Sequence, residues 1–246
     1  AFYRTYYVPN NALVAAAGDF KAPELLEKIR RAFGPIPRAA DPPPLTVAEP
    51  RQNGERRVTV KKEAQLPLVF IGYPVPNFRS PDAPALELLS MILSEGRSSR
   101  LYRRLVYERQ IALNAGGDYS YFSTDPNLFW FFATALPGQT PEALERALMQ
   151  EVERLKTEPV SAAELERAKN QIEASFVFRQ DSVYSRASLL ARFELIGGWQ
   201  LRDQFVPAIR AVTAADLQRV ARAHFPDERR NVGVLLPIPP GSAPRS

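Results

Sequence analysis

Residues 111–136, IALNAGGDYSYFSTDPNLFWFFATAL, predict the β-hairpin that decides the fold class. Two runs of strand character flank the sequence Asp-Pro-Asn at residues 125–127, which has the composition of a turn. The run LFWFF at residues 128–132 is apolar on both faces, which suits an inner strand with one face under helices. Its other face would then lie against another surface, and a partner interface is the alternative to a core.

The other elements arrive along the chain in runs and not in strict alternation of strand and helix. Strands are expected at residues 12–17, 56–63, 66–73 and 231–236. Helices are expected where capping residues precede apolar stripes, near Asp19, Ser80, Ser98, Thr140, Ser161 and Thr213. The helix from Ser161 is expected to continue to Gly197. This order predicts an α+β fold with a mostly antiparallel sheet backed by helices.

A proline-rich stretch marks the clearest domain boundary in the sequence. Five prolines lie between residues 35 and 44, and such a stretch resists regular secondary structure and favours an extended chain. We therefore expect a linker at residues 39–55. It separates residues 1–38 from a larger domain at residues 56–246.

Composition excludes several classes of protein. The chain has 246 residues, 45% of them hydrophobic, which is enough for a sizeable core. It contains no run of about 18 apolar residues, so no membrane span is expected. No zinc-finger, aromatic RNA-binding or phosphate-loop motif is present, so no nucleic-acid partner is expected.

The densest basic patch consists of arginines that fall within one short stretch: Arg97, Arg100, Arg103, Arg104 and Arg109. Several of them would share one face of a helix. We interpret them as a solvated helix face, because acidic residues are interspersed throughout the chain. The alternative is an anion-binding face, which steeply salt-dependent binding of nucleic acid would support.

The sequence contains few of the residue types that bind zinc. The chain contains one histidine, His224, and no cysteine. A hydrolytic zinc ion needs three protein ligands and one open position, and two histidines on one helix are impossible here whatever the fold. His224 comes at the end of a predicted helix, where capping or surface packing is its expected role. No metal site is therefore expected in these residues.

Two distant segments share one pattern. Residues 2–17 place aromatic residues, proline and asparagine ahead of an apolar run, and residues 220–234 repeat this order. The similarity suggests two copies of one unit, with the first copy truncated at its front.

Residues 2–20, FYRTYYVPNNALVAAAGDF, resemble the closing strand of the first domain in pitrilysin-type (insulinase-like) zinc peptidases. The stretches FGPIP at 33–37, SSRLYRRL at 98–105 and VTAADL at 212–217 resemble later parts of that family in the same order. The resemblance covers nearly the whole chain. It implies the metallohydrolase fold of LuxS and the mitochondrial processing peptidases, and it places the chain in the family's non-catalytic C-terminal part.

The resemblance also implies where the chemistry lies. The family carries His-x-x-Glu-His and a downstream glutamate, which together bind zinc and activate water, upstream of the segment that matches Ala1. Residues 1–38 would then be the end of the zinc-bearing domain, and residues 56–246 an inactive peptidase-like domain. This implies no cofactor in the fragment, which is expected to be inactive alone, and zinc in a parent metalloendopeptidase.

Many members of the family carry an arginine and a tyrosine in the second domain, which help to hold the substrate carbonyl near zinc. The aligned positions here are Val106 and Leu113, and neither side chain can donate a hydrogen bond. Tyr107 and Arg109 lie close by but out of register. They are the candidate substrate-binding residues.

Two functions follow from the resemblance. The first is half of a peptidase chamber that encloses an extended peptide and packs on the catalytic zinc domain or on a sister subunit. A sister subunit is included because some bacterial members are heterodimers. The second is a non-catalytic scaffold, because relatives of this fold serve as core subunits of respiratory complexes. The sequence leaves open whether such a bacterial protein is periplasmic or cytoplasmic.

Overall fold

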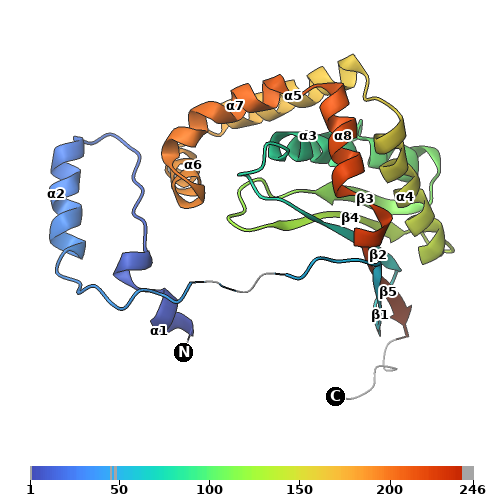
Figure 1. Cartoon of the computed structure of the whole chain (residues 1–246), viewed down its shortest axis with the longest axis horizontal. Coiled ribbons are helices and arrows are strands. Elements are labelled where there is room, and N and C mark those ends of the chain that lie inside the picture. The colour runs from blue at the N-terminus through green and yellow to red at the C-terminus, as the bar shows by residue number, and fades with distance from the viewer. Residues whose placement is uncertain (1, 45, 47–48, 240–246) are drawn as a thin grey trace. The chain divides into compact units, whose positions relative to one another are not determined.

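The computed structural model describes residues 2–44, 46 and 49–239 (Figure 1). The chain divides into two compact units. One comprises Ala1–Arg51 and Val177–Gln200, and the other comprises Gln52–Phe176 and Leu201–Ser246. The second of these is the larger unit and holds the β-sheet.

Within the described residues, the larger unit is built on one five-stranded sheet. Its strands, in spatial order, are β1 (Arg56–Glu63), β5 (Asn231–Ile238), β2 (Leu68–Val75), β4 (Asn127–Ala135) and β3 (Ala112–Asp118). β1 runs parallel to β5, and the other neighbouring pairs are antiparallel. The predicted α+β class with a mostly antiparallel sheet is confirmed, and β3 and β4 form the predicted hairpin.

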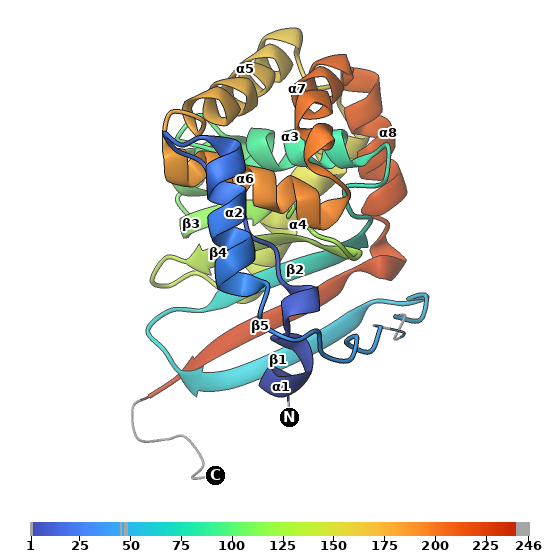
Figure 2. The same cartoon turned by 90° about the vertical axis from the view of Figure 1, so that its left-hand side faces the viewer.

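Helices pack against one face of this sheet (Figures 1 and 2). α3 (Ala83–Ser94) contacts β3, α4 (Pro141–Thr157) contacts β2 and β4, and α8 (Ala214–His224) contacts β2. α7 (Arg202–Ala211) contacts α3. Figure 1 shows α7 and α5 (Ala162–Phe178) beyond α3 on the side away from the sheet.

The core lies between the sheet and these helices. Tyr73, Phe129, Phe131 and Phe225 are fully buried, and their ring centroids lie 5.0 to 6.1 Å apart in successive contacts. Burial of one such side chain stabilises a fold by about 1.5–3 kcal/mol. Phe225 follows α8 directly, so its ring joins the end of that helix to β2 and β4.

Capping residues place two helix starts where the sequence predicted them. Thr140 precedes α4, and its Oγ1 accepts a hydrogen bond from the N–H of Ala143 at 3.2 Å. Thr213 and Asp216 form a complete capping box at the start of α8. Each cap accepts a hydrogen bond from a backbone N–H that has no acceptor within the helix. It stabilises the helix by about 1 kcal/mol.

The single helix expected from Ser161 to Gly197 is wrong. α5 ends at Phe178, and α6 (Val183–Ile196) begins after Ser182, whose Oγ accepts a bond from the N–H of Ser185 at 3.4 Å. The intervening sequence RQDS offers polar side chains that bond the backbone locally and compete with the helix.

η2 (Tyr102–Glu108) is a π-helix in place of the ordinary helix expected from Ser98 to Gln110. The N–H of Arg109 donates to the carbonyl of Arg104 at 3.0 Å, which is the five-residue spacing of a π-helix. Gln110 then takes a left-handed backbone with a φ of 50°, and β3 starts two residues later.

The smaller unit contains α1 (Phe2–Tyr6), η1 (Pro9–Asn11), α2 (Ala22–Phe33) and α6, together with the first two residues of η3 (Trp199–Leu201). The strand expected at residues 12–17 is wrong, because these residues have no partner strand in the described chain and a lone strand leaves its backbone unpaired. α2 starts after Lys21, later than the cap expected at Asp19. In the part of the chain that the structure describes, no helix has the length and apolar character that a membrane crossing needs.

Candidate functional site

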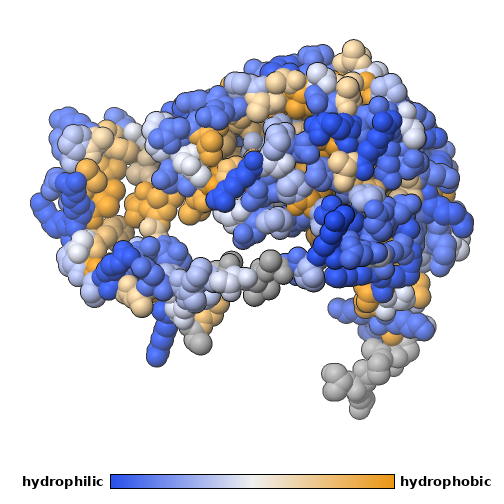
Figure 3. All heavy atoms as spheres, viewed as in Figure 1, coloured by the Kyte–Doolittle hydropathy of each residue, from blue (hydrophilic) through white to orange (hydrophobic). Residues whose placement is uncertain are grey.

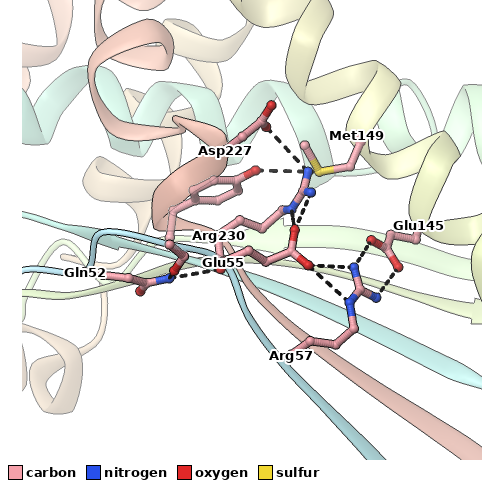
Figure 4. Close-up of polar contacts among 9 residues, drawn as sticks. Gln52, Glu55, Arg57, Glu145, Met149, Asp227 and Arg230 are labelled. Carbon is pink, nitrogen blue, oxygen red and sulfur yellow. Dashed lines mark hydrogen bonds and ion pairs between the residues drawn. The ribbon is translucent and has the colours of Figure 1, made fainter.

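A row of ion pairs braces the edge strand β1 (Figure 4). Arg57 donates to both carboxylate oxygens of Glu145 on α4, at 2.8 and 2.7 Å, and its Nε donates to Glu55 at 3.1 Å. Arg230 donates to the other oxygen of Glu55 through Nε at 2.8 Å and also through Nη2. These bonds tie the start of β1 to α4 and to the residue that precedes β5.

The two arginines hold Glu55 in its charged form. Burial by itself would raise the pKa of this carboxyl, but hydrogen bonds from Arg230 and Arg57 lower it below its ordinary value of 4.5. Hydrogen bonding to Glu145 raises the pKa of Arg57 above its already high ordinary value. Two cations face two carboxylates, so this cluster serves as an electrostatic brace and not as a source of protons near neutral pH.

The sheet face opposite the helices is apolar and open. Val58, Phe70 and Leu128 are 58%, 42% and 42% exposed, and the ring of Phe70 lies 5.8 Å from that of Trp130. A groove of about 460 Å³ lies among these side chains. The side chains of the LFWFF run therefore alternate between the two faces of the sheet. Phe129 and Phe131 are buried under the helices, and the other three line this open face.

The two candidate substrate-binding residues lie on the surface at η2. Tyr107 is 73% exposed, and Arg109 is exposed with its Nη1 donating to Gln150 Oε1 on α4 at 2.9 Å. Val106 is partly buried in η2, and Leu113 on β3 is 53% exposed. A role for Tyr107 and Arg109 in binding a substrate stays a prediction.

The only histidine of the sequence lies beside a carboxylate. His224 Nε2 lies 2.8 Å from Asp82 Oδ2, and Arg219 Nη2 lies 2.9 Å from the other carboxylate oxygen. The remaining neighbour of the Asp82 carboxylate is the cation Arg219, so this contact offers no third ligand for zinc. No group of three potential ligands stands together among the described side chains. These residues therefore do not fit the zinc ion of a hydrolase.

The fold and these sites define a class of protein. The chain carries a helix-backed α+β domain in which the charged cluster at the start of β1 is paired internally and the apolar sheet face is open. The ligand set of a hydrolytic metal is missing from the sequence itself.

Comparison with known proteins identifies the family. The family described as "Peptidase M16 inactive domain" matches residues 1–172. The chain therefore belongs to this family of inactive peptidase domains. The resemblance to the non-catalytic part of pitrilysin-type zinc peptidases, predicted from segments such as residues 2–20, is confirmed.

Named relatives are consistent with this assignment. The chain is 31% identical over 240 residues to the zinc protease PqqE of Helicobacter pylori, covering 96% of this chain and 54% of that protein. A crystal structure of a protease from Helicobacter pylori matches with a TM-score of 0.91 at 30% identity, over 96% of this chain and 57% of that one. The M16 inactive domain from Pseudomonas fluorescens shares the fold, with a TM-score of 0.77 at 14% identity over 90% of this chain and 52% of that one. The chain thus spans about half the length of the curated relative.

Sequence reasoning missed the brace of Glu55, Arg57, Glu145 and Arg230. Arg57 and Glu145 are 88 residues apart, and Glu55 and Arg230 are 175 apart, so no local pattern links them. The open sheet face did leave a signal in the sequence. In the run LFWFF at residues 128–132, the side chains that would point to either face of a strand are all apolar.

Proposed function

We propose that this chain is the non-catalytic half of an M16-type zinc metallopeptidase. It packs on a zinc-bearing half, in the same protein or in a sister subunit, and forms part of the wall that encloses extended peptides. In this proposal, residues 1–38 complete the zinc-bearing domain, residues 39–55 link the two domains, and residues 56–246 form the inactive domain. Zinc is bound by the other half.

The observation that carries this proposal is the uncovered apolar surface near the start of the chain. Among the described residues up to Arg51, Val8 alone is buried. α2 nevertheless has an apolar stripe, on which Leu26 is 45% exposed and Phe33 is 53% exposed. Figure 3 shows apolar residues gathered along one side of α2. A surface of this kind is stabilised when a partner covers it, by about 25 cal/mol for each Å² of apolar area removed from water.

Metal analysis and peptide cleavage test the proposal directly. The purified chain is expected to bind no stoichiometric zinc and to cleave no peptide, because one imidazole cannot supply the ligands that a hydrolytic zinc needs. When the zinc-bearing half is added, chelator-sensitive cleavage is expected to appear or to rise at least tenfold. One tight zinc per chain, or chelator-sensitive cleavage by the chain alone, would contradict the proposal.

Tyr107 and Arg109 are proposed to contact the peptide. Tyr107 is exposed on a π-helix, a rare geometry that often occurs at functional sites. The double variant Tyr107→Phe, Arg109→Gln in the assembled peptidase is expected to raise KM for a peptide several-fold, since it removes the tyrosine hydroxyl and the positive charge of the guanidinium. Arg97→Gln, a neutralised arginine in the loop before η2, is the matched control. Equal KM values for all three proteins would reject this role.

A scaffold without peptidase activity is the second candidate. Val106 and Leu113 stand where many members of the family carry an arginine and a tyrosine. This favours the scaffold, because these two apolar side chains cannot donate a hydrogen bond to a substrate carbonyl. A complex with the zinc-bearing half that forms stably but never cleaves a peptide would support the scaffold and reject the chamber.

A further inference from the structure

β1 forms one edge of the sheet, and its outer side has no partner strand among the described residues. The N–H of Arg56 donates to the carbonyl of Arg230 at 3.0 Å, on the side of β5. Backbone groups of successive residues in a strand point to opposite sides, so those of Arg57, Thr59 and Lys61 point away from β5. Each of these three residues offers one unpaired N–H and one unpaired C=O to an incoming strand.

This edge lacks most of the features by which proteins block strand pairing, namely prolines, bulges and a covering segment. β1 contains no proline, it pairs with β5 without a register shift, and all eight of its residues are exposed. β5 pairs with β2 only as far as Leu235, so the last residues of β1 and β5 project beyond the other strands (Figure 1). The remaining protection is charge, which selects among partners and does not exclude all of them.

Four alternate residues of β1 form a row with a cation at each end. Side chains at every second position of a strand share a face, so this row consists of Arg56, Val58, Val60 and Lys62. Val58 and Val60 are 58% and 47% exposed. In the part of the chain that the structure describes, no carboxylate forms an ion pair with Arg56 or Lys62. The row therefore presents two uncompensated positive charges on either side of an apolar pair.

The same row selects against a second copy of this chain. Antiparallel pairing of the row with itself would set Arg56 opposite Lys62 and Val58 opposite Val60. Like charges directly opposite one another destabilise a strand pair, whereas opposite charges stabilise it by about 0.2–1 kcal/mol. The complementary strand therefore carries an acidic residue, two apolar residues and a second acidic residue at alternate positions.

We propose that the outer edge of β1 binds an extended acidic segment of a partner protein, which adds an antiparallel strand to the sheet. Backbone bonds to Arg57, Thr59 and Lys61 supply affinity, and the row with its two cations supplies specificity. The bonds from Arg57 to Glu145 and Glu55 hold the start of this edge in place before the segment arrives, which lowers the entropic cost of binding. The binding does not require the zinc-bearing half.

A seven-residue probe, Glu-Thr-Val-Thr-Val-Thr-Glu with both ends capped, matches this row. Its glutamates and valines lie opposite the row, and its threonines bring their backbone groups to the free edge. NMR measures amide exchange with water in the whole chain. Near saturation the probe is expected to slow exchange at Arg57, Thr59 and Lys61 about tenfold, because exchange occurs from the unbound fraction. The amides of Val58 and Val60 point to β5 and are expected to change little.

Selective methylation of the probe separates backbone pairing from adhesion of side chains. Methylating the three threonine amides removes the donors that face β1 and is expected to weaken binding at least about tenfold. Methylating the two valine amides, which point away from β1, is the matched control and is expected to leave the affinity unchanged. A probe with lysine in place of both glutamates is expected to bind more weakly as well, since like charges then face Arg56 and Lys62. Fluorescence anisotropy of dye-labelled probes measures these affinities.

Two substitutions in the chain test the edge and the charge. Thr59→Pro removes the central donor and is expected to weaken binding about tenfold with little change in melting temperature, since proline is tolerated where an edge N–H faces solvent. Thr59→Val keeps the N–H and is the matched control. Lys62→Glu is expected to weaken binding about fivefold. Lys28→Glu makes the same charge change at an exposed residue of α2 and is expected to bind like the wild type.

Slowed exchange at the three outward amides, together with the loss of affinity on threonine methylation, supports the inference. Failure of the probe to bind the wild type, or full affinity of the threonine-methylated probe, overturns it. Protection of the same amides without the probe, increasing with protein concentration, would assign the edge to a second copy and overturns it too. If Thr59→Pro does not fold, the methylated probes and Lys62→Glu still decide the outcome.

Discussion

Asp82 joins the start of α3 to the end of α8 through His224 and Arg219. Burial by itself would raise the pKa of this carboxyl, but the hydrogen bonds from Arg219 and His224 outweigh burial and lower it below the ordinary value of 3.8. A carboxyl whose folded-state pKa is lowered stabilises the fold above its unfolded pKa. That stability is lost as the pH falls through the folded-state pKa.

Asp82→Asn is therefore expected to lower the free energy of unfolding by about 1.5 kcal/mol at neutral pH, at the low end for a charged hydrogen bond because Arg219 is exposed. The difference from the wild type is expected to shrink as the pH falls below about 4. Urea denaturation at pH 7 and at low pH measures it. Asp125→Asn, at an exposed carboxyl in the β3–β4 turn, is the control. A loss for Asp82→Asn that does not depend on pH would contradict the ion-pair argument.

His224 illustrates what residue-level reasoning can and cannot reach. Its inability to build a zinc site follows from counting ligands, and that conclusion holds for any fold. Its actual partner does not follow, because Asp82 lies 142 residues away in the sequence. Capping and surface packing are the expectations for a histidine at a helix end, whereas the observed contact is a polar contact of 2.8 Å with a carboxylate at the start of another helix.

At the scale of elements, the β3–β4 hairpin depends on a close approach at Gly117. A Cβ at this residue would lie 3.1 Å from the carbonyl oxygen of Trp130 and 3.2 Å from Phe131 Cδ1. The first of these atoms belongs to the backbone of the neighbouring strand, so it cannot move away without disturbing the ladder.

Gly117→Ala is expected to destabilise the chain by about 1–3 kcal/mol, the usual cost of overpacking a core. Gly54→Ala is the matched control, because a Cβ there would meet nothing within 4 Å, and its effect should be near zero or slightly stabilising. Chemical denaturation of both variants measures the effect. Equal stabilities would show that β3 and β4 separate easily at this point.

Elements were predictable where a local signal specified them. Apolar periodicity and caps identified β1, the hairpin, α4 and α8, since these signals act over a few residues. η2 was not predictable, because a π-helix has the same composition as an α-helix and its register is fixed by distant partners. One such partner is Glu151 of α4, whose carboxylate lies 3.0 Å from Arg104 Nε.

At the scale of the whole molecule, the chain consists of a well-packed unit and a segment with little core of its own. Leu26→Asp and Phe33→Asp on α2 are expected to leave the unfolding of the larger unit unchanged, because these side chains are exposed. The same variants are expected to weaken association with the zinc-bearing half at least tenfold. Lys28→Ala, an exposed residue on the same helix, is the control. Analytical ultracentrifugation measures the association, and unchanged affinity would reject α2 as a contact surface.

The sequence by itself determined that these residues cannot hold a hydrolytic zinc, because a ligand count does not depend on the fold. It also determined the α+β class, because short-range periodicity distinguishes strands from helices. Only the tertiary structure decided that β1 lies parallel to β5, that Arg57 and Arg230 share Glu55, and that β1 forms one edge of the sheet. These features join residues that are far apart in the chain, such as Val58 and Gly233. Their pairing is selected by the packing of the whole core and not by any local stretch.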